Sequence, residues 1–181
     1  MKTLFLGIAA LIILTVVAAL YSAPGGAQPS GGNALVPYMG SADLSFSYPR
    51  TYTLTERSDS FEGNPIRVLT FIDSSISVPD MSDGPEAISI IEVPNPQNLP
   101  LEQWVKEKSI SNFSLSPDQK LSPSTLGGAP AVSYTHSGLY ESKALAAEHN
   151  GTIYLVSVGS VNPGDAIYRD FQNIVNTLHF K

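Results

Sequence analysis

The residues of this chain that could do chemistry are few and widely spaced. Three histidines, His136, His149 and His179, are the candidate metal ligands or general bases. No two of them lie one helical turn apart and the chain has no cysteine, so their spacing matches no zinc motif. His149 directly precedes an Asn-Gly turn, and we interpret it as a solvated turn residue. A site built on these histidines therefore depends wholly on how the fold places them.

A second candidate is the acidic loop Pro79–Gly84, which partly resembles a calcium loop. When Gly84 is aligned with the invariant glycine of an EF-hand, Pro79 and Met81 fall where carboxylates belong. An EF-hand is therefore excluded. We interpret the segment as a polar surface loop, with an irregular calcium site at Asp80 and Asp83 as the alternative.

Signatures of known catalytic sites are missing from the sequence. It has no Gly-x-Ser-x-Gly elbow, no Ser-x-x-Lys and no His-Glu-x-x-His. Gly127-Gly128 lacks the lysine of a phosphate-binding loop, and carboxylates such as Glu141 and Glu148 are scattered. We therefore predict no catalytic residue, no cofactor and no metal. An enzyme whose site is assembled from distant residues is the alternative, since triads can form in that way.

Aromatic residues could instead line a ligand pocket. Trp104, Tyr134 and Tyr154 offer large contact area and a polar atom each. Their spacing fits core or half-buried sheet positions better, so we interpret all three as structural.

Charge excludes one class of partner. The chain has 10 basic and 16 acidic residues, a net charge of −6, and only Lys2 precedes Asp43, so the remainder is more acidic still. An acidic domain without a basic stripe is repelled by nucleic acid. We predict that the chain does not bind nucleic acid.

The first residues predict export. Leu4 to Tyr21 is an apolar run without a charged residue, just long enough to cross a bilayer as a helix. Lys2 precedes the run and no basic residue follows until Arg50, which favours a cytoplasmic N-terminus. We predict a transmembrane anchor at residues 1–23, and a cleaved signal peptide is the alternative. A flexible Gly/Pro/Ser linker at residues 24–41 and a folded domain at residues 42–181 follow.

Periodicity within the domain predicts strands, a helix, more strands, a second helix and a short final strand. The first short strand alternates at Leu44, Phe46 and Tyr48, and a helix beginning near Asn98 as N-cap buries a stripe with Trp104. Asn150-Gly151 predicts a two-residue hairpin. Further strands are expected at 51–57, 66–73, 86–93, 119–126, 131–136, 140–149 and 152–158. Turns are expected at 58–65 and 127–130, and the strand 119–126 is expected at an edge because Pro123 cannot donate to a ladder. The final helix repeats Ile167, Phe171, Ile174, Val175 and Leu178, and Leu178 and Phe180 end the chain as a short strand. This order predicts an α+β fold, a central antiparallel sheet flanked by helices, plus one N-terminal hydrophobic helix.

The order and spacing of several short motifs resemble the PsbP/Mog1-like fold family, which includes small bacterial domains of unknown function. The motifs are Phe46-Ser-Tyr-Pro49, Leu101-Glu-Gln-Trp104, Gly127-Gly-Ala-Pro-Ala131 with Tyr134, Gly151-Thr-Ile-Tyr154, Phe171-Gln-Asn-Ile-Val175 and Leu178-His-Phe180. The resemblance covers about Leu44 to Lys181 and implies a sheet between helices. It implies no function, because members of the family differ in role and no functional residue set matches.

Together these features predict a membrane-tethered, extracytoplasmic, non-catalytic interaction or accessory module with a protein partner in the cell envelope. The alternative is a small-ligand or metal-binding carrier. We expect any site to lie in the loops around Asp73–Gly84 and Asn112–Asp118 rather than in the hairpin and final helix, whose residues are explained by folding.

Overall fold

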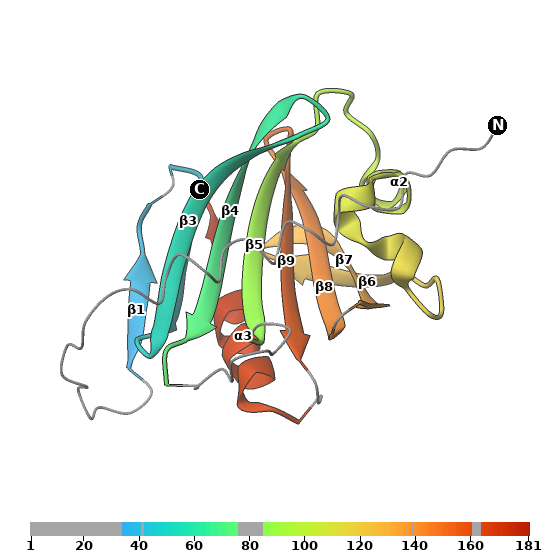
Figure 1. Ribbon diagram of the computed structural model, residues 1–181. Helices are drawn as coiled ribbons and strands as arrows, with labels where there is room; N and C mark the ends of the chain where they lie inside the picture. Colours follow the sequence, from blue (N-terminus) through green and yellow to red (C-terminus); the bar gives the residue numbers. More distant parts are fainter. Residues whose placement is uncertain (1–33, 41, 76–84, 139, 161–163) are drawn as a thin grey trace.

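The computed structural model describes residues 34–40, 42–75, 85–138, 140–160 and 164–181, which form two antiparallel sheets (Figure 1). The large sheet has seven strands, in the spatial order β3 (Tyr52–Phe61), β4 (Asn64–Asp73), β5 (Ala87–Pro94), β9 (Thr152–Ser160), β8 (Glu141–His149), β7 (Ala129–Ser137) and β6 (Ser122–Leu126). A small sheet joins β1 (Leu35–Tyr38), β2 (Leu44–Pro49) and β10 (His179–Phe180).

Three tight turns fix the register of the large sheet. The loops Glu62-Gly63, Gly127-Gly128 and Asn150-Gly151 each have positive φ at both residues, as type I′ hairpins require. The third confirms the predicted hairpin, since His149 pairs with Thr152 across it.

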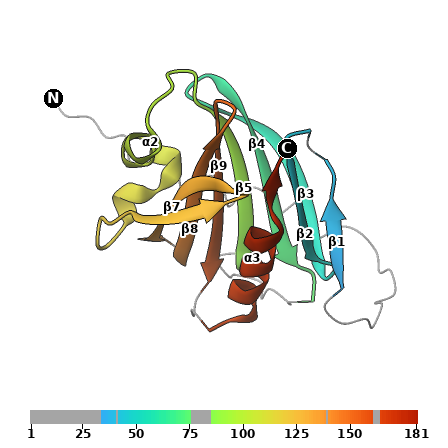
Figure 2. The same cartoon turned by 180° about the vertical axis from the view of Figure 1, so that it is seen from behind.

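One face of the large sheet is covered by the helix α3 (Ala166–Thr177) together with the small sheet (Figure 2). The helix turns its apolar stripe inward, and Ile167, Phe171 and Ile174 are buried against the strands. Since each strand alternates its side chains, the same strands send Phe71, Ile90 and other residues into this core.

The opposite face is covered at one end by the helix α2 (Leu101–Glu107) and two 3₁₀ turns, η2 (Ser109–Ser111) and η3 (Phe113–Leu115). Trp104 and Val105 of α2 are fully buried, and Phe113 of η3 packs beside them. This second core holds the short helix in place on the sheet.

The structure corrects the predicted fold class. The described residues are 54% strand and only 19% helix, and they form two sheets, so a helix-flanked α+β sandwich is wrong and the fold is mostly β. A second β layer shares one face with α3, and α2 is a single short helix on the other. Local periodicity could not reveal the small sheet, because β2 and β10 come from opposite ends of the domain.

Several element boundaries also differ from prediction. Leu35–Tyr38 were assigned to the linker but form β1, and β3 continues to Phe61 through residues predicted as a turn. Asn98 is not the N-cap of α2: it has φ of 49° in the preceding turn, and Pro100 holds the N-cap position. Asn95 organises this entry instead, because its side chain bonds both the N–H and the carbonyl of Leu99.

The predicted hydrophobic segment at residues 1–23 lies outside the described residues, as does most of the predicted linker. Within the part of the chain that the structure describes, no helix is long and apolar enough to cross a bilayer.

Candidate functional site

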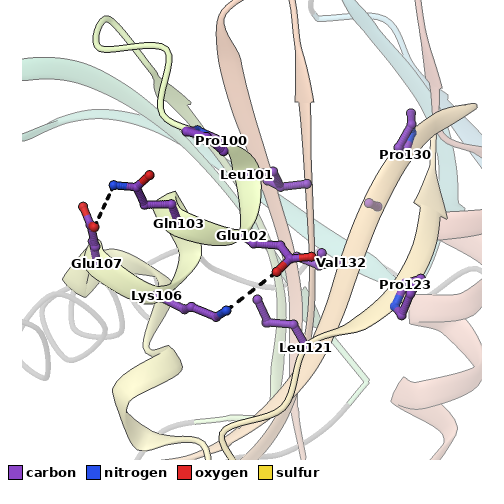
Figure 3. A pocket seen from close by; sticks show the side chains of 11 residues that line it. Pro100, Leu101, Glu102, Gln103, Lys106, Glu107, Leu121, Pro123, Pro130 and Val132 are labelled. Atoms are coloured by element: carbon purple, nitrogen blue, oxygen red, sulfur yellow. Dashed lines mark hydrogen bonds and ion pairs between the residues drawn. The ribbon is translucent and has the colours of Figure 1, made fainter.

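An open groove of about 680 Å³ runs between α2 and the β6–β7 hairpin (Figure 3). It is lined by residues of two elements that are adjacent in space but separated along the chain, namely Pro100, Leu101, Glu102, Gln103, Lys106 and Glu107 on the helix side and Leu121, Pro123, Pro130, Ala131 and Val132 on the hairpin side. The floor is apolar and the helix wall is charged.

The helix wall follows from how α2 is anchored. Burial of Trp104 and Val105 fixes the rotation of the helix, and this rotation leaves Glu102 and Lys106 facing the hairpin (Figure 3). Their ion pair, 3.6 Å between Oε2 and Nζ, is well exposed, so it contributes little to stability. It can therefore exchange its partners for those of a bound molecule at low cost.

The hairpin wall is built around two prolines. The tight turn at Gly127-Gly128 makes Leu126 and Ala129 a hydrogen-bonded pair, so the alternating pattern makes Pro123–Val132 and Thr125–Pro130 non-hydrogen-bonded pairs. At these positions a proline removes no bond from the β6–β7 ladder. The prolines thus keep the ladder intact and give the groove a rigid apolar wall.

The side chains that line the groove are mostly apolar, with charged groups on the helix wall. None of the residues that line it carries a hydroxyl, an imidazole or a thiol, and its ionisable groups are Glu102, Lys106 and Glu107. Their apolar side chains and one exchangeable ion pair suit an apolar partner segment with a polar or charged neighbour.

A second polar feature, the Arg67 cluster, lies on the side of the large sheet that faces the small sheet. Arg67 Nε donates to Glu56 Oε1 at 2.7 Å and Nη1 to Glu92 Oε1 at 3.2 Å. Nη2 donates to the Gly40 carbonyl at 2.8 Å and to the Tyr38 hydroxyl, which in turn donates to Glu56 Oε2 at 3.2 Å. One arginine of the large sheet therefore fastens the segment that follows β1.

Electrostatics in this cluster follow burial and pairing. Burial raises the pKa of Tyr38 to about 12, and burial also raises the pKa of Glu92 above its usual range despite the nearby guanidinium. The hydrogen bond from Arg67 lowers the pKa of Glu56, which is more exposed. All partners in the cluster are side chains or carbonyls of the chain itself, so its contacts are those of a structural fastening.

The structure keeps the three histidines in unrelated surroundings. His136, in β7, is buried at 9% exposure, its Nδ1 has no hydrogen-bond partner among the described residues, and burial lowers its pKa. His149 stacks on Phe180 with ring centroids 4.8 Å apart and meets the Lys181 carbonyl at 3.2 Å through Nε2. His179 is exposed in β10. No group of three or more potential metal ligands is found in the described ranges.

The other candidates are explained by packing. Trp104 and Tyr134 belong to the core under α2, whereas Tyr154 belongs to the core on the opposite face, so the three line no common pocket. Glu148 accepts the Gly151 N–H in the β8–β9 turn, while Glu141 is exposed.

The two loops expected to hold a site give different outcomes. The segment 112–118 contains the turn η3, which inserts Phe113 into the core, and Ser116 Oγ donates to Asp118 at 3.0 Å. The acidic residues Asp80 and Asp83 lie outside the described residues. Asp73 at the start of that loop closes a local turn with Ser75.

Comparison with known proteins leaves the family open. No protein-family model matches the chain, and no curated protein matches it either. The resemblance to PsbP/Mog1-like domains stays a prediction.

Two solved structures are similar at low identity. One is a protein from Bacteroides thetaiotaomicron VPI-5482, with 14% identity and a TM-score of 0.47, matched over 76% of this chain and 45% of that protein. The other is LpqN of Mycobacterium tuberculosis, described as involved in cell envelope biogenesis, with 10% identity and a TM-score of 0.37 over 82% and 91% of the two chains. The chain thus spans less than half of the first protein.

Proposed function

We propose that this chain is an exported, non-catalytic interaction module that holds an extended segment of a partner polypeptide in the groove between α2 and the β6–β7 hairpin. Its apolar N-terminal segment would direct it to the cell envelope, with the domain on the extracytoplasmic side.

The observation that carries this proposal is the open form of the groove. Small-molecule sites typically enclose most of their ligand in a concave cavity. This groove is open, and one of its walls belongs to β6, the last strand of the large sheet. Such a shape suits a chain that enters at one end and leaves at the other.

Charge and surface chemistry support the same partner. The apolar floor of Leu101, Leu121 and Val132 offers a seat for one or two apolar side chains. Glu102 and Lys106 stand beside that seat and can each meet an opposite charge. A polypeptide with alternating apolar and charged residues satisfies both features.

Display of random peptides against the full chain in detergent tests this proposal. We expect enriched peptides to bind the full chain. A Leu121→Glu variant, which places a charge on the floor, should bind them at least tenfold more weakly. A Ser124→Glu variant puts the same charge on β6 outside the groove lining and is the matched control. Equal binding by all three proteins, or no enrichment at all, contradicts the proposal.

A small-ligand carrier is the second candidate, favoured by the groove volume of about 680 Å³, which lies inside the roughly 300–1,000 Å³ range of small-molecule sites. Thermal-shift measurements with a panel of metals and small ligands distinguish the two. Stabilisation by a small ligand that is lost in Leu121→Glu favours the carrier.

A further inference from the structure

β3 is the other outer strand of the large sheet, and its free edge follows a clear pattern. The type I′ turn at Glu62-Gly63 makes Phe61 and Asn64 a hydrogen-bonded pair. Alternation along an antiparallel ladder then directs the backbone of the odd-numbered residues toward β4 and that of the even-numbered residues outward. Pro65, opposite Ser60, agrees with this phase because its position needs no N–H.

Most outward backbone N–H groups in the middle of β3 have no hydrogen-bond partner in the described part of the chain. The N–H of Ser60 is satisfied by Asp59 Oδ1 at 2.8 Å, but no hydrogen bond joins the N–H of Leu54, Glu56 or Ser58 to the described residues. Glu56 and Ser58 are also exposed. A long edge of this kind is a template for another strand.

The two outer strands of the sheet differ in how they are protected. β6 has five residues and includes Pro123, whereas β3 has ten residues and no proline. Charged side chains usually protect an edge, and β3 has them at Glu56, Arg57 and Asp59. These charges repel only strands whose charges do not match. A strand with opposite charges at the facing positions is attracted to the edge instead.

The order of these charges is self-complementary. We infer that β3 is a self-association surface that pairs antiparallel with β3 of a second copy of this chain, about a two-fold axis at Ser58. This register places Arg57 of each copy opposite Asp59 of the other in a non-hydrogen-bonded pair, where side chains approach most closely. It also lets Ser58 exchange two backbone hydrogen bonds with its own symmetry mate.

Arg57 is poorly satisfied within one copy. Its Nη2 lies 3.7 Å from Asp59 Oδ2, too far for a hydrogen bond, and its Nε is buried without a partner among the described residues. A second copy supplies an additional carboxylate from across the ladder. The unsatisfied guanidinium and the free edge therefore point to the same partner.

Neighbouring registers are disfavoured by charge. An axis at Arg57 places two arginines opposite each other, and an axis at Asp59 does the same with two carboxylates. An axis at Glu56 opposes two glutamates. Among these, only the axis at Ser58 gives Arg57 and Asp59 opposite charges as partners, so the sequence of β3 selects one register.

Charge exchange between copies tests the inference. In R57D both facing positions are acidic, and in D59R both are basic, so each variant alone should dimerise at least tenfold more weakly than the natural chain. A one-to-one mixture of R57D and D59R restores both ion pairs and should recover the dimer, measured by sedimentation equilibrium of the full chain in detergent. All proteins share the same N-terminal segment, so association through that segment is equal in each. Unchanged dimerisation in the single variants, or a mixture that stays monomeric, overturns the inference.

A cysteine pair tests the register independently of charge. The chain has no cysteine, so S58C introduces a single thiol at the proposed axis, where hydrogen-bonded partners have Cα atoms about 5.5 Å apart, within disulfide range. S60C, at the same edge, faces Glu56 of the other copy rather than itself. We expect oxidant to convert S58C, but not S60C, into a covalent dimer. Equal crosslinking of the two variants, or none, overturns the proposed axis.

Discussion

Replacing Trp104 by alanine tests whether the candidate groove depends on one anchor. Trp104 is 1% exposed and is the largest fully buried side chain. Burial of about 200 Å² of aromatic surface at about 25 cal/mol per Å² contributes roughly 5 kcal/mol. Truncation of a buried Trp to alanine costs about 3–5 kcal/mol in proteins, so the two values agree.

W104A should strongly destabilise the whole domain and should also increase local opening of α2. A loss of about 3–5 kcal/mol lowers the melting temperature of a domain of this size on the order of 10–20 °C. Only Trp104 and Val105 of α2 are buried, so the helix should also open locally more often than the sheet. Amide hydrogens of α2 should then exchange faster than those of β5 and β9.

Chemical denaturation and hydrogen exchange, read together, decide this prediction. Q103A is the matched control, because Gln103 is exposed on the same helix and makes one exposed hydrogen bond to Glu107. It should cost no more than about 0.5 kcal/mol. A loss below about 1 kcal/mol in W104A, or unchanged exchange in α2, would refute the reasoning that Trp104 holds the groove wall on the sheet.

Three other substitutions test separate features. Burial raises the pKa of Glu92 above its ordinary value of 4.5, so ionisation of this side chain as the pH rises destabilises the folded state. E92Q cannot ionise and should therefore gain stability relative to the natural chain between about pH 4 and pH 7 in urea titrations. A stability difference between the two proteins that does not change with pH would contradict this. Ser111 Oγ, buried, meets two backbone carbonyls at 2.6 and 2.7 Å and accepts a backbone N–H, so S111A should lose about 1–3 kcal/mol; exposed S109A should lose almost none. Gly127 has φ of 61°, and a Cβ added there would lie 2.7 Å from Phe180 and 2.8 Å from Leu178, whereas a Cβ added at Gly128 meets nothing within 4 Å. G127A should therefore lower the melting temperature more than G128A. The reverse order would contradict the observed packing.

Local signals in the sequence predicted individual elements well. The Asn150-Gly151 hairpin is confirmed because only a few residue types tolerate positive φ at both turn positions. The final helix is confirmed because Ile167, Phe171 and Ile174 recur at helical spacing and are buried. In both cases the deciding physics lies within a few neighbouring residues.

Nonlocal features could not be predicted in the same way. β3 was predicted to stop before Ser58 because residues 58–65 were interpreted as a turn closed by Asn64-Pro65, but an outer strand can expose polar residues and still pair on its other side. β1 was missed for a similar reason, since only Tyr38 of its four residues is buried. Strand pairing with a distant segment, rather than composition, keeps both ordered.

The groove was missed although its parts were noticed separately. The sequence predicted the apolar stripe of α2, an edge strand containing Pro123, and a turn before Pro130. Nothing in their spacing placed the helix over the hairpin, because that arrangement depends on packing against β7 and β8. The pair of prolines flanking a Gly-Gly turn is the signal that could have indicated a rigid wall.

The Arg67 cluster also has a mechanical consequence. Any load transmitted along the chain from before residue 34 reaches β1 first, and β1 pairs with β2 over only four residues. Beyond that pairing, the guanidinium of Arg67 holds Tyr38 and Gly40. Under tension, β1 and the contacts that Arg67 makes with Tyr38 and Gly40 should therefore separate first. The seven-stranded sheet, whose strands pair over longer stretches, should stay folded while the chain lengthens by the few residues of β1 and the segment that follows it.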